Sequence, residues 1–284
     1  MRTGLAMEGG AMRGMFTAGV IDVLMENHIT FDAAAGISAG AVFGCNIKSN
    51  QIGRVIRYNK KYCRDPRYCS LKSWLTTGNL YGREFCYSLI PNRLDPFDAE
   101  AFRNNPMKFY VGTTDVDTGK TVYFSCKNGD SSDIEKMRAS ASMPIVSKIV
   151  EISGHRLLDG GVTDPVPLRY LQCKGYDRDI VILTQPKGYR KAQSKAAPLI
   201  HFLLRKYPAL AHAMDIRYLR YNKQMDEIDK QETEGKIITI RPPHKLEVGK
   251  AEKNPDKLEE VYQIGRKQAE SQIEKVKMFL QVAK

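Results

Sequence analysis

FDAAAGISAGAVFG, residues 31–44, places a serine between two glycines, Gly36-Ile37-Ser38-Ala39-Gly40. The small apolar run before Ser38 is typical of a buried strand, and the apolar run Ala39–Ile47 is typical of a buried helix. A G-x-S-x-G sequence between a strand and a helix has the form of a nucleophile elbow, whose strained turn lets the serine project. Glycines beside it permit close packing, and helix N-terminal amides favour negative charge. Ser38 is therefore either a nucleophile or a small residue in a packed corner.

The residues around this stretch predict a parallel α/β sheet. Thr3–Met7 is a short apolar run that suits a buried strand, and Gly14–His28 carries apolar residues at helical spacing, which predicts an amphipathic helix. Phe31–Ile37 then forms the second strand. The order strand, helix, strand, helix is typical of a parallel sheet with helices packed on it.

The rest of the chain continues this pattern, and we predict one domain over residues 1–284 with an irregular insertion at 51–107. Strands are expected at 108–116 and 121–126, joined by a hairpin at 117–120, and at 155–161, 179–186 and 236–243. Helices are expected at Asp133–Ser142, within 197–230, and at Pro255–Val282.

A second glycine turn, Glu8-Gly9-Gly10-Ala11-Met12-Arg13-Gly14, also lies between a strand and a helix. It approximates a dinucleotide fingerprint, but that motif needs an acid at the end of the next strand, where this chain has the Ser38 turn. The alternative is an oxyanion hole, in which backbone amides free of side-chain cover lie beside Ser38. Arg13 would either add positive charge there or form a surface salt bridge.

A third turn, Leu157-Leu158-Asp159-Gly160-Gly161, ends a strand with an acid before two glycines. Alone, Asp159 suits an Asx turn. An activated serine needs a base, usually histidine, yet none of the five histidines lies in a glycine-framed strand end. His155 shares a strand with Asp159 but lies about 12 Å away along it. The histidines are His28, His155, His201, His212 and His244.

The three turns together resemble the signature of patatin-like phospholipases. Their residues are Gly-Gly-Ala-Met-Arg-Gly (9–14), Gly-Ile-Ser-Ala-Gly (36–40) and Asp-Gly-Gly (159–161), and residues 113–124 and 138–146 also resemble that family's core. The resemblance covers about residues 4–186, whereas 187–284 carries no motif that we can place. It implies a three-layer fold with a mainly parallel sheet flanked by helices on both faces.

The resemblance also implies a mechanism. Ser38 would be the nucleophile, Asp159 its general base, and the amides of Gly9, Gly10 and Ala11 the oxyanion hole. The expected activity is that of a serine lipid acyl hydrolase, of the phospholipase A or carboxylesterase type, acting on a lipid or ester substrate. Glu8 stands where family members often have Asp, and Ala11 replaces a third glycine, which narrows the expected hole.

Such a dyad needs neither metal nor cofactor. The sequence Asp-Val-Asp-Thr-Gly-Lys at 115–120 resembles the start of a calcium loop but lacks its downstream acid, so we interpret it as a hairpin turn. The six cysteines contain no C-x-x-C pair, which favours free thiols, with Cys45 a small buried side chain. Neither a secretory signal nor an apolar run of about 18 residues is present, so we expect a cytoplasmic protein.

The net charge of +12 suits either solubility alone or an anionic partner. Residues 188–223 are rich in Arg, Lys and Tyr with apolar residues between them, which would form either a membrane-facing stripe or a core helix under a solvated face. We hypothesise peripheral contact with anionic membrane, and we expect no nucleic-acid partner because no binding module is present. The sequence contains no indication of oligomeric state.

Two alternative functions remain. One is a histidine-dependent α/β-hydrolase that pairs Ser38 with His201, His212 or His244, although in that fold the elbow usually follows several strands. The other is a catalytically silent protein that keeps the fold for binding lipid or a partner, because a fold alone never establishes activity.

Overall fold

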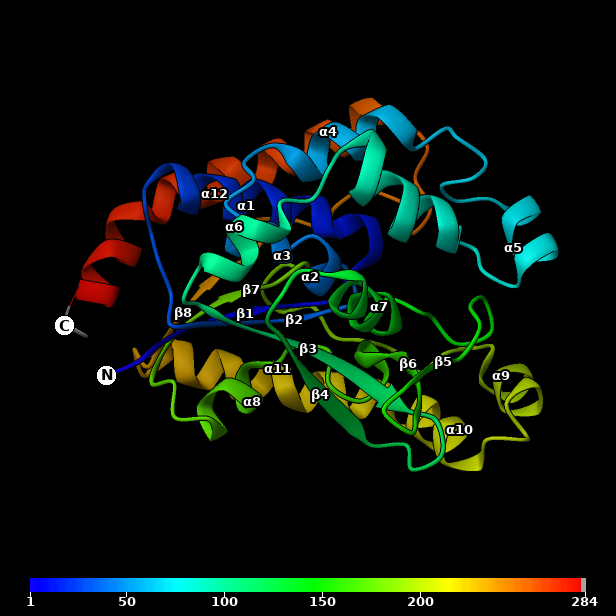
Figure 1. Cartoon of the computed structure of the whole chain (residues 1–284). Helices are drawn as coiled ribbons and strands as arrows, with labels where there is room; N and C mark the ends of the chain where they lie inside the picture. The colour runs from blue at the N-terminus through cyan, green and yellow to red at the C-terminus, as the bar shows by residue number, and fades with distance from the viewer. Residues whose placement is uncertain (282–284) are drawn as a thin grey trace.

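An eight-stranded sheet forms the centre of the computed structural model, which describes residues 1–281 (Figure 1). The strands are β1 (Thr3–Met7), β2 (Ala33–Ile37), β3 (Lys108–Asp115), β4 (Thr121–Cys126), β5 (Val150–Ile152), β6 (His155–Asp159), β7 (Arg178–Ile182) and β8 (Ile237–Ile240). Their order in space is β5-β6-β3-β2-β1-β7-β8, with β4 also paired to β3. The pairs among β3, β2, β1, β7 and β8 are parallel, whereas β4, β5 and β6 pair antiparallel. The predicted mainly parallel sheet is confirmed.

Helices cover both faces of the sheet, which confirms the predicted three-layer architecture (Figure 1). The helices are α1 (Gly14–Glu26), α2 (Ala39–Val42), α3 (Cys45–Lys48), α4 (Arg54–Tyr62), α5 (Leu71–Thr77), α6 (Ala99–Asn104), α7 (Ser131–Ser140), α8 (Leu168–Cys173), α9 (Ala197–Leu203), α10 (Pro208–Asp215), α11 (Arg217–Thr233) and α12 (Pro255–Gln281). Helices α1, α4 and α12 pack on one face, and α8 and α11 on the other. Because neighbouring strand residues point to opposite faces, Leu5 and Ala6 belong to different cores.

Helix α1 is buried almost all round, so the predicted amphipathic helix was wrong in that respect. It begins as predicted at Gly14 but ends at Glu26, and α12 covers the face that would otherwise meet water. The two helices cross closely: a Cβ on Gly19 would lie 2.1 Å from the Tyr262 carbonyl oxygen, and one on Gly265 would lie 2.2 Å from that of Phe16. Glycines at both positions therefore allow the backbones to approach each other. Helix α12 was predicted to reach Val282, which lies outside the described residues.

Other boundaries differ for local reasons. The predicted helix Ala39–Ile47 is split into α2 and α3, because the chain turns at Phe43 and Gly44. The carbonyls of these two residues accept the amides three positions further on, those of Asn46 and Ile47. Helix α7 begins earlier than predicted, since the Asp130 carboxylate caps it by accepting from the Asp133 amide at 3.0 Å.

Strand β5 was not predicted. It is only three residues long, and its hairpin with β6 turns through Ser153 and Gly154 at positive φ. A serine at such a position lacks the Asn-Gly or Asp-Gly pattern that usually marks a short hairpin.

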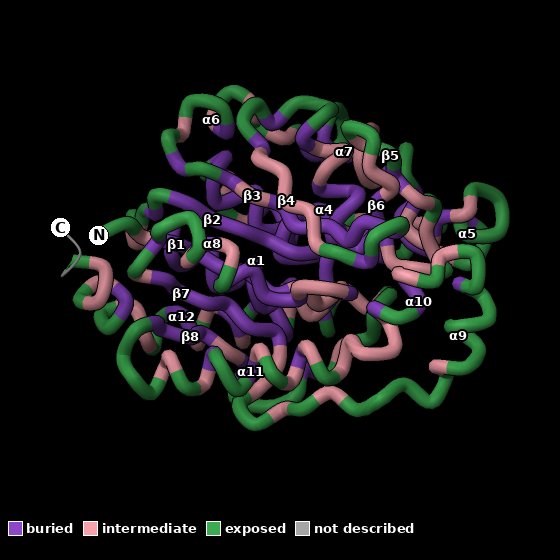
Figure 2. Tube along the Cα trace, turned by 90° about the horizontal axis from the view of Figure 1, so that it is seen from below, coloured by how far each residue is buried: buried purple, intermediate pink, exposed green. Residues whose placement is uncertain are grey.

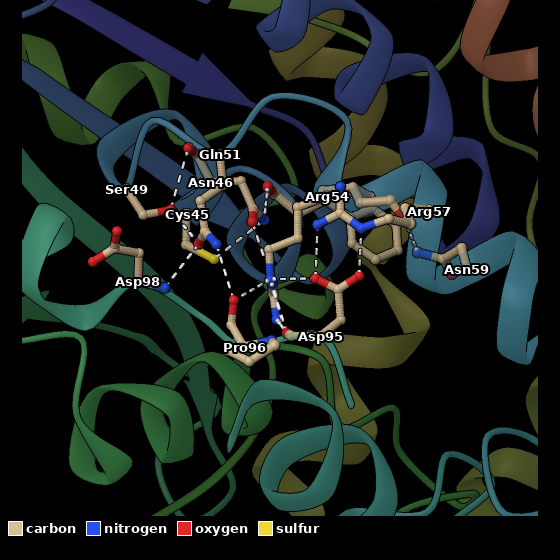
Figure 3. Close-up of polar contacts among 12 residues, drawn as sticks. Cys45, Asn46, Ser49, Gln51, Arg54, Arg57, Asn59, Asp95, Pro96 and Asp98 are labelled. Atoms are coloured by element: carbon tan, nitrogen blue, oxygen red, sulfur yellow. Dashed lines mark hydrogen bonds and ion pairs between the residues drawn. The ribbon is translucent and has the colours of Figure 1, made fainter. Parts of the chain in front are cut away.

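The insertion at 51–107 is helix and loop, as predicted, and a buried polar cluster fixes it to the core (Figure 3). The Asp95 carboxylate accepts two bonds from the Arg57 guanidinium, at 2.7 and 2.8 Å. Arg54, which is 4% exposed, donates to the Asp95 backbone carbonyl and to Asn46 on α3. The cluster thereby joins α3, α4 and the end of the π-helical segment Phe85–Leu94.

No helix within residues 1–281 combines the length and the apolar character needed to cross a membrane. All six cysteines are free, as expected, and Cys45 is buried. Burial raises the pKa of the Cys45 thiol to about 12, so this side chain stays neutral and acts as a small apolar group.

Candidate active site

Strand β3 brings Ser38 and Asp159 together. Strand β2 pairs with β3 in parallel, and β6 pairs with the same edge of β3 antiparallel. The carboxyl ends of β2 and β6 therefore meet. Ile37 at the end of β2 is in register with Gly112, and Asp159 at the end of β6 is in register with the next residue, Thr113. The residue after Ile37 therefore meets Asp159, although 121 positions separate Ser38 and Asp159 in the sequence.

The Ser38 hydroxyl donates a hydrogen bond to the Asp159 carboxylate, with 2.8 Å between Oγ and Oδ2. Both side chains are buried, at 8% and 7% exposure. Ser38 has φ +54° and ψ −120°, a strained combination for a residue with a side chain. The strain identifies a sharp turn between β2 and α2, as the G-x-S-x-G sequence predicts.

The two glycines beside Ser38 allow this turn to fold against its surroundings. A Cβ on Gly36 would lie 2.2 Å from the Gly40 carbonyl oxygen, and a Cβ on Gly40 would lie 2.4 Å from that of Met7. Gly14 has the same role at the start of α1, where a Cβ would lie 2.7 Å from Ala39 Cβ. These positions tolerate no larger residue without backbone movement.

Ser140, at the end of α7, contacts Ser38 and is a residue of the candidate site that sequence reasoning missed. Its Oγ accepts the Ser38 amide at 2.8 Å and donates to the Gly112 carbonyl at 2.6 Å. It thus ties the strained residue to β3. Ser140 lies in the stretch 138–146 that resembles the family core, but nothing in that stretch indicates which of its serines faces Ser38.

The Asp159 carboxylate acts both in an Asx turn and as the partner of Ser38, so the two interpretations of this residue hold together. Its Oδ1 accepts the Gly161 amide at 2.7 Å, and its Oδ2 accepts Ser38. Gly160 lies against β3, where a Cβ would be 2.3 Å from the Gly112 carbonyl oxygen. The Asx bond fixes the orientation of the carboxylate that faces the serine.

The environment makes Asp159 a better base than a solvated aspartate. Burial raises its pKa, because a charged carboxylate loses solvation there. Hydrogen bonds from Ser38 and Gly161, and the charges of Arg217 and Lys191, act in the opposite direction. The pKa of Asp159 remains raised, which moves this carboxyl toward the range in which it can accept a proton near neutrality.

The loop between β1 and α1 lies beside the dyad, but it requires a correction to the predicted oxyanion hole. The Gly9 amide donates to the Pro165 carbonyl at 3.2 Å, so it is already occupied. Within the described residues, the Gly10 and Ala11 amides have no protein acceptor. Ala11 has φ +49°, a conformation that glycine adopts more easily, so the replacement of a third glycine introduces local strain.

The Glu8 side chain anchors this loop through two hydrogen bonds. Its carboxylate is 1% exposed, accepts the Thr184 amide at 2.6 Å, and accepts the Tyr221 hydroxyl of α11 at 3.0 Å. Arg13 forms no ion pair within residues 1–281, so the predicted alternative of a surface salt bridge is wrong. Its Nε is buried and has no hydrogen-bond partner there.

Helix α11, in the part of the chain without recognisable motifs, contributes a second residue that sequence reasoning missed. The Arg217 guanidinium Nε donates to the Gly161 carbonyl at 2.7 Å, and its charge reaches Asp159. Gln224 on the same helix donates to Asp164 and to the Val166 carbonyl. Residues 187–284 therefore help to build the site, a role that no local pattern in this segment indicates.

A small pocket of about 70 Å³ opens beside Ser38, with largely aromatic and apolar walls. It is lined by Ala11, Met12, Ser38, Ala39, Val42, Phe43, Tyr58, Tyr68, Tyr81, Cys86, Tyr87, Ala141 and Met143. The hydroxyls of Tyr68 and Tyr81 bond elsewhere, to the Asn59 side chain and the Lys250 carbonyl. Their rings are thus left to form an apolar wall.

The remaining candidate groups lie in other contacts. The Asp115 carboxylate accepts amide bonds from Asp117 and Thr118 in the hairpin between β3 and β4, as expected for a turn, and it also pairs with His155. His201 pairs with Asp215. No histidine among residues 1–281 hydrogen-bonds to Ser38, and no group of three or more His, Cys, Asp or Glu side chains there is placed to hold a metal.

Fold and site together define the class of protein: an α/β protein whose strained serine elbow faces a buried carboxylate. A family model described as patatin-like phospholipase matches residues 5–171. The chain belongs to the patatin-like phospholipase family, which confirms the resemblance carried by its three glycine turns. A second model, a domain of unknown function (DUF6363), matches residues 207–281.

Several known proteins are similar to this chain. Uncharacterized protein YjjU of Escherichia coli is 26% identical over 198 residues, covering 65% of this chain and 52% of YjjU. An uncharacterized NTE family protein of Mycobacterium tuberculosis is 26% identical over 196 residues, covering 69% of this chain and 52% of that protein. The chain thus spans about half the length of these curated relatives.

Two further matches cover nearly all of this chain. Lysophospholipase nte1 of Aspergillus terreus is 25% identical over 297 residues, covering 96% of this chain and 18% of that protein. The crystal structure of VipD from Legionella pneumophila overlaps 96% of this chain and 67% of VipD, with a TM-score of 0.47 and 11% identity.

Proposed function

We propose that this chain is a serine lipid acyl hydrolase, a carboxylic ester hydrolase that cleaves fatty acyl esters through Ser38 and Asp159. The observation that carries the proposal is the 2.8 Å hydrogen bond between Ser38 Oγ and Asp159 Oδ2 at a strained elbow. Membership of the patatin-like phospholipase family and the similarity to lysophospholipase nte1 support a lipid ester as the substrate.

In the proposed mechanism, Ser38 Oγ attacks the ester carbonyl carbon while Asp159 takes the hydroxyl proton. The Gly10 and Ala11 amides donate to the oxyanion that develops on the carbonyl oxygen. The tetrahedral intermediate collapses, and the leaving alkoxide takes the proton from Asp159. Water then attacks the acyl-enzyme carbonyl and gives a proton to Asp159. This second tetrahedral intermediate collapses, the fatty acid leaves, and Ser38 Oγ takes the proton from Asp159, which restores both the hydroxyl and the carboxylate.

The small pocket beside Ser38 suits the acyl chain. Val42, Phe43 and Met143 offer apolar surface, and the tyrosine rings extend it. Transfer of methylene groups from water onto such walls contributes about 0.8 kcal/mol per buried CH₂. The carbonyl carbon of a chain bound there would lie next to Ser38, with its oxygen toward Gly10 and Ala11.

The proposal is tested by hydrolysis of p-nitrophenyl esters of graded chain length by wild type, Ser38→Ala and Asp159→Asn. We expect both variants to lose at least about 10³-fold in kcat/KM while keeping the wild-type circular dichroism and melting temperature. Asp159→Asn keeps the shape of the side chain and removes the base. Turnover that persists in either variant removes that residue from the mechanism.

The two alternative functions predict different results. A histidine-dependent hydrolase would retain most of its activity in Asp159→Asn and lose it in a histidine variant. A silent binding protein would show no turnover with any ester, while still binding lipid.

A further inference from the structure

Two short helices at one end of the molecule expose apolar side chains. Helices α5 and α9 lie at the same end in both views, opposite the chain termini (Figures 1 and 2). The exposed residues are Leu71, Trp74 and Leu75 on α5 and Leu199, Phe202 and Leu203 on α9, which we call the α5/α9 surface. Three exposed apolar side chains on each of two helices at one end of the molecule are more than the single, scattered ones that need no explanation.

The spacing on α5 makes its exposed face a continuous apolar stripe. Leu71, Trp74 and Leu75 stand at positions i, i+3 and i+4, which share one side of a helix. Leu75 is 77% exposed, and Ser73 is the buried residue of this helix. The apolar side of α5 therefore faces outward, the reverse of the usual orientation in a water-facing helix.

Helix α9 is apolar on two sides, and the core covers one of them. Ile200 packs against the cluster that includes Leu204 and Leu210, which anchors the helix. Phe202, on the outer side, is 60% exposed, and no residue of α9 is buried. A helix that is apolar all round normally has a partner on each side.

Cations without an ion-pair partner in the described residues border these side chains and favour an anionic partner. Residues 66–83, around α5, and 185–214, around α9, contain no Asp or Glu. Four cations of these segments form no ion pair within residues 1–281 and lie away from Asp159: Lys72, Lys195, Arg205 and Lys206. The others pair with acids, as Arg67, Arg83, Lys187 and Arg190 do, or lie near Asp159, as Lys191 does. Apolar side chains bordered by cations are the combination that binds at the surface of an anionic bilayer.

The α5/α9 surface also connects with the candidate active site. Tyr68 and Tyr81 line the pocket beside Ser38 and lie just before and just after α5 in the chain. Their rings meet edge to face at 5.8 Å, and an isolated bridge joins the neighbouring Cys69 to Tyr81. Helix α5 is therefore the tip of a loop whose base forms the wall of the pocket.

We infer that the α5/α9 surface docks this chain on anionic phospholipid bilayers, with α5 inserting its apolar stripe next to the entrance of the Ser38 pocket. The inference rests on the proposed function, to which it adds the surface through which the enzyme would reach its lipid substrate. Docking here would let a lipid acyl chain pass from the bilayer to Ser38 without crossing water.

Trp74 provides a direct probe, because it is the only tryptophan of the chain. Ser38→Ala protein, which should not alter the lipid, is titrated with vesicles of phosphatidylcholine containing phosphatidylglycerol and with vesicles of phosphatidylcholine alone. We expect the Trp74 emission to shift to the blue and to become protected from a soluble quencher only with the anionic vesicles. Salt should weaken the binding.

Matched charge changes locate the surface. Leu75→Asp and Phe202→Asp, each in the Ser38→Ala background, should weaken vesicle binding at least about tenfold. Met278→Asp is the control, because Met278 is 61% exposed on α12, near the opposite end of the molecule, and undergoes the same change in charge. Equal effects at all three positions would overturn the inference. So would co-sedimentation with anionic vesicles that leaves Trp74 emission unchanged.

Two further experiments test whether a second copy of the chain covers the α5/α9 surface, and whether a change at this surface leaves ester hydrolysis intact. A concentration-dependent dimer that Leu75→Asp dissociates, seen by analytical ultracentrifugation, would show that a second copy covers the surface and would overturn membrane docking. In a wild-type background, Leu75→Asp should hydrolyse a soluble short-chain ester normally. Vesicle binding without ester turnover in the wild type would refute the proposed function and leave the docking surface standing.

Discussion

The basicity of Asp159 depends on opposing effects that the structure identifies residue by residue. Burial raises its pKa, and the positive charge of Arg217 lowers it. The groups that face Asp159 are Ser38 on the elbow, the Gly161 amide, Arg217 on α11, Lys191 in the loop after β7 and Tyr87 on the π-helical segment. The proposed base works only as a carboxylate, so activity must fall as the pH drops through this pKa.

Arg217→Met should therefore move the acidic limb of kcat/KM to higher pH, by up to about one unit, because the carboxylate loses a stabilising charge. At a pH below the limb, kcat/KM would fall by up to about tenfold relative to wild type. The measurement is a pH profile with a soluble ester for wild type, Arg217→Met and Arg217→Lys.

Arg217→Lys is the control, since it keeps the charge and should keep the limb close to that of wild type. A purely structural role for the Arg217–Gly161 bond would lower activity equally at every pH. An unshifted limb in Arg217→Met would therefore contradict the electrostatic role.

The sequence predicted the residues of the site that its turns mark, and it missed those that only tertiary contact defines. Ser38 and Asp159 stand in glycine-framed turns at strand ends, where backbone geometry demands glycine. Ser140 and Arg217 carry no such local signal: Ser140 meets Ser38 across 102 positions, and Arg217 meets Gly161 across 56. Likewise, the bond that occupies the Gly9 amide, which we predicted for the proposed oxyanion hole, comes from Pro165, far along the chain.

Helices α1 and α12 pack closely against each other, and a glycine on each helix permits the close approach. Gly19→Ala would place a methyl group 2.1 Å from the Tyr262 carbonyl oxygen, which is backbone and cannot rotate away. We expect a loss of about 1–3 kcal/mol in the free energy of unfolding in urea, because the helices must separate. Gly249→Ala is the control: its Cβ would come no closer than 3.8 Å to other groups, and its stability should change by less than about 0.5 kcal/mol. Similar losses in both variants would refute the close-contact argument.

The Asp22 carboxylate, between α1 and α12, makes the stability of the folded protein depend on pH. Its Oδ2 accepts both the Tyr262 hydroxyl of α12, at 2.7 Å, and the Gly53 amide before α4, at 2.9 Å. Burial raises its pKa from 3.8 to about 6, so the folded protein holds a proton that the unfolded chain has released. The resulting stability is complete below about pH 4 and is lost as the pH rises through about 6.

Asp22→Asn should abolish this dependence, because the amide oxygen can accept both bonds and does not titrate. Relative to the variant, wild type should lose up to about 3 kcal/mol of unfolding free energy between pH 4 and pH 7. Urea unfolding at several pH values measures the difference. Parallel pH curves for the two proteins would mean that Asp22 does not titrate in this window.

The predictions for α1 and for the segment that forms α2 and α3 show which features of a helix can be predicted from sequence. Apolar spacing located α1, but it could not show that α12 covers it, so α1 was assigned a polar face. The continuous apolar run Ala39–Ile47 predicted one helix, although the close passage of this segment over β1 breaks it: a Cβ on Gly44 would lie 2.4 Å from Met7 Sδ. In both cases the deciding contact comes from another element.

Two family models match this chain, at residues 5–171 and 207–281, yet we propose that the matched segments fold as one cooperative unit. The second segment supplies β8 at the sheet edge, α12 over α1, and the α11 bonds from Tyr221 to Glu8 and from Arg217 to Gly161. A chain of residues 1–206 would expose the apolar face of α1 and lose two bonds at the site.

We expect this 1–206 chain to lack a cooperative thermal transition and ester turnover, whereas adding residues 207–284 as a separate chain during refolding should restore part of both. Circular dichroism and p-nitrophenyl ester hydrolysis measure these outcomes. A cooperatively folded, active 1–206 fragment would instead make the two matched segments independent domains, and the Arg217 contribution to Asp159 would then be dispensable.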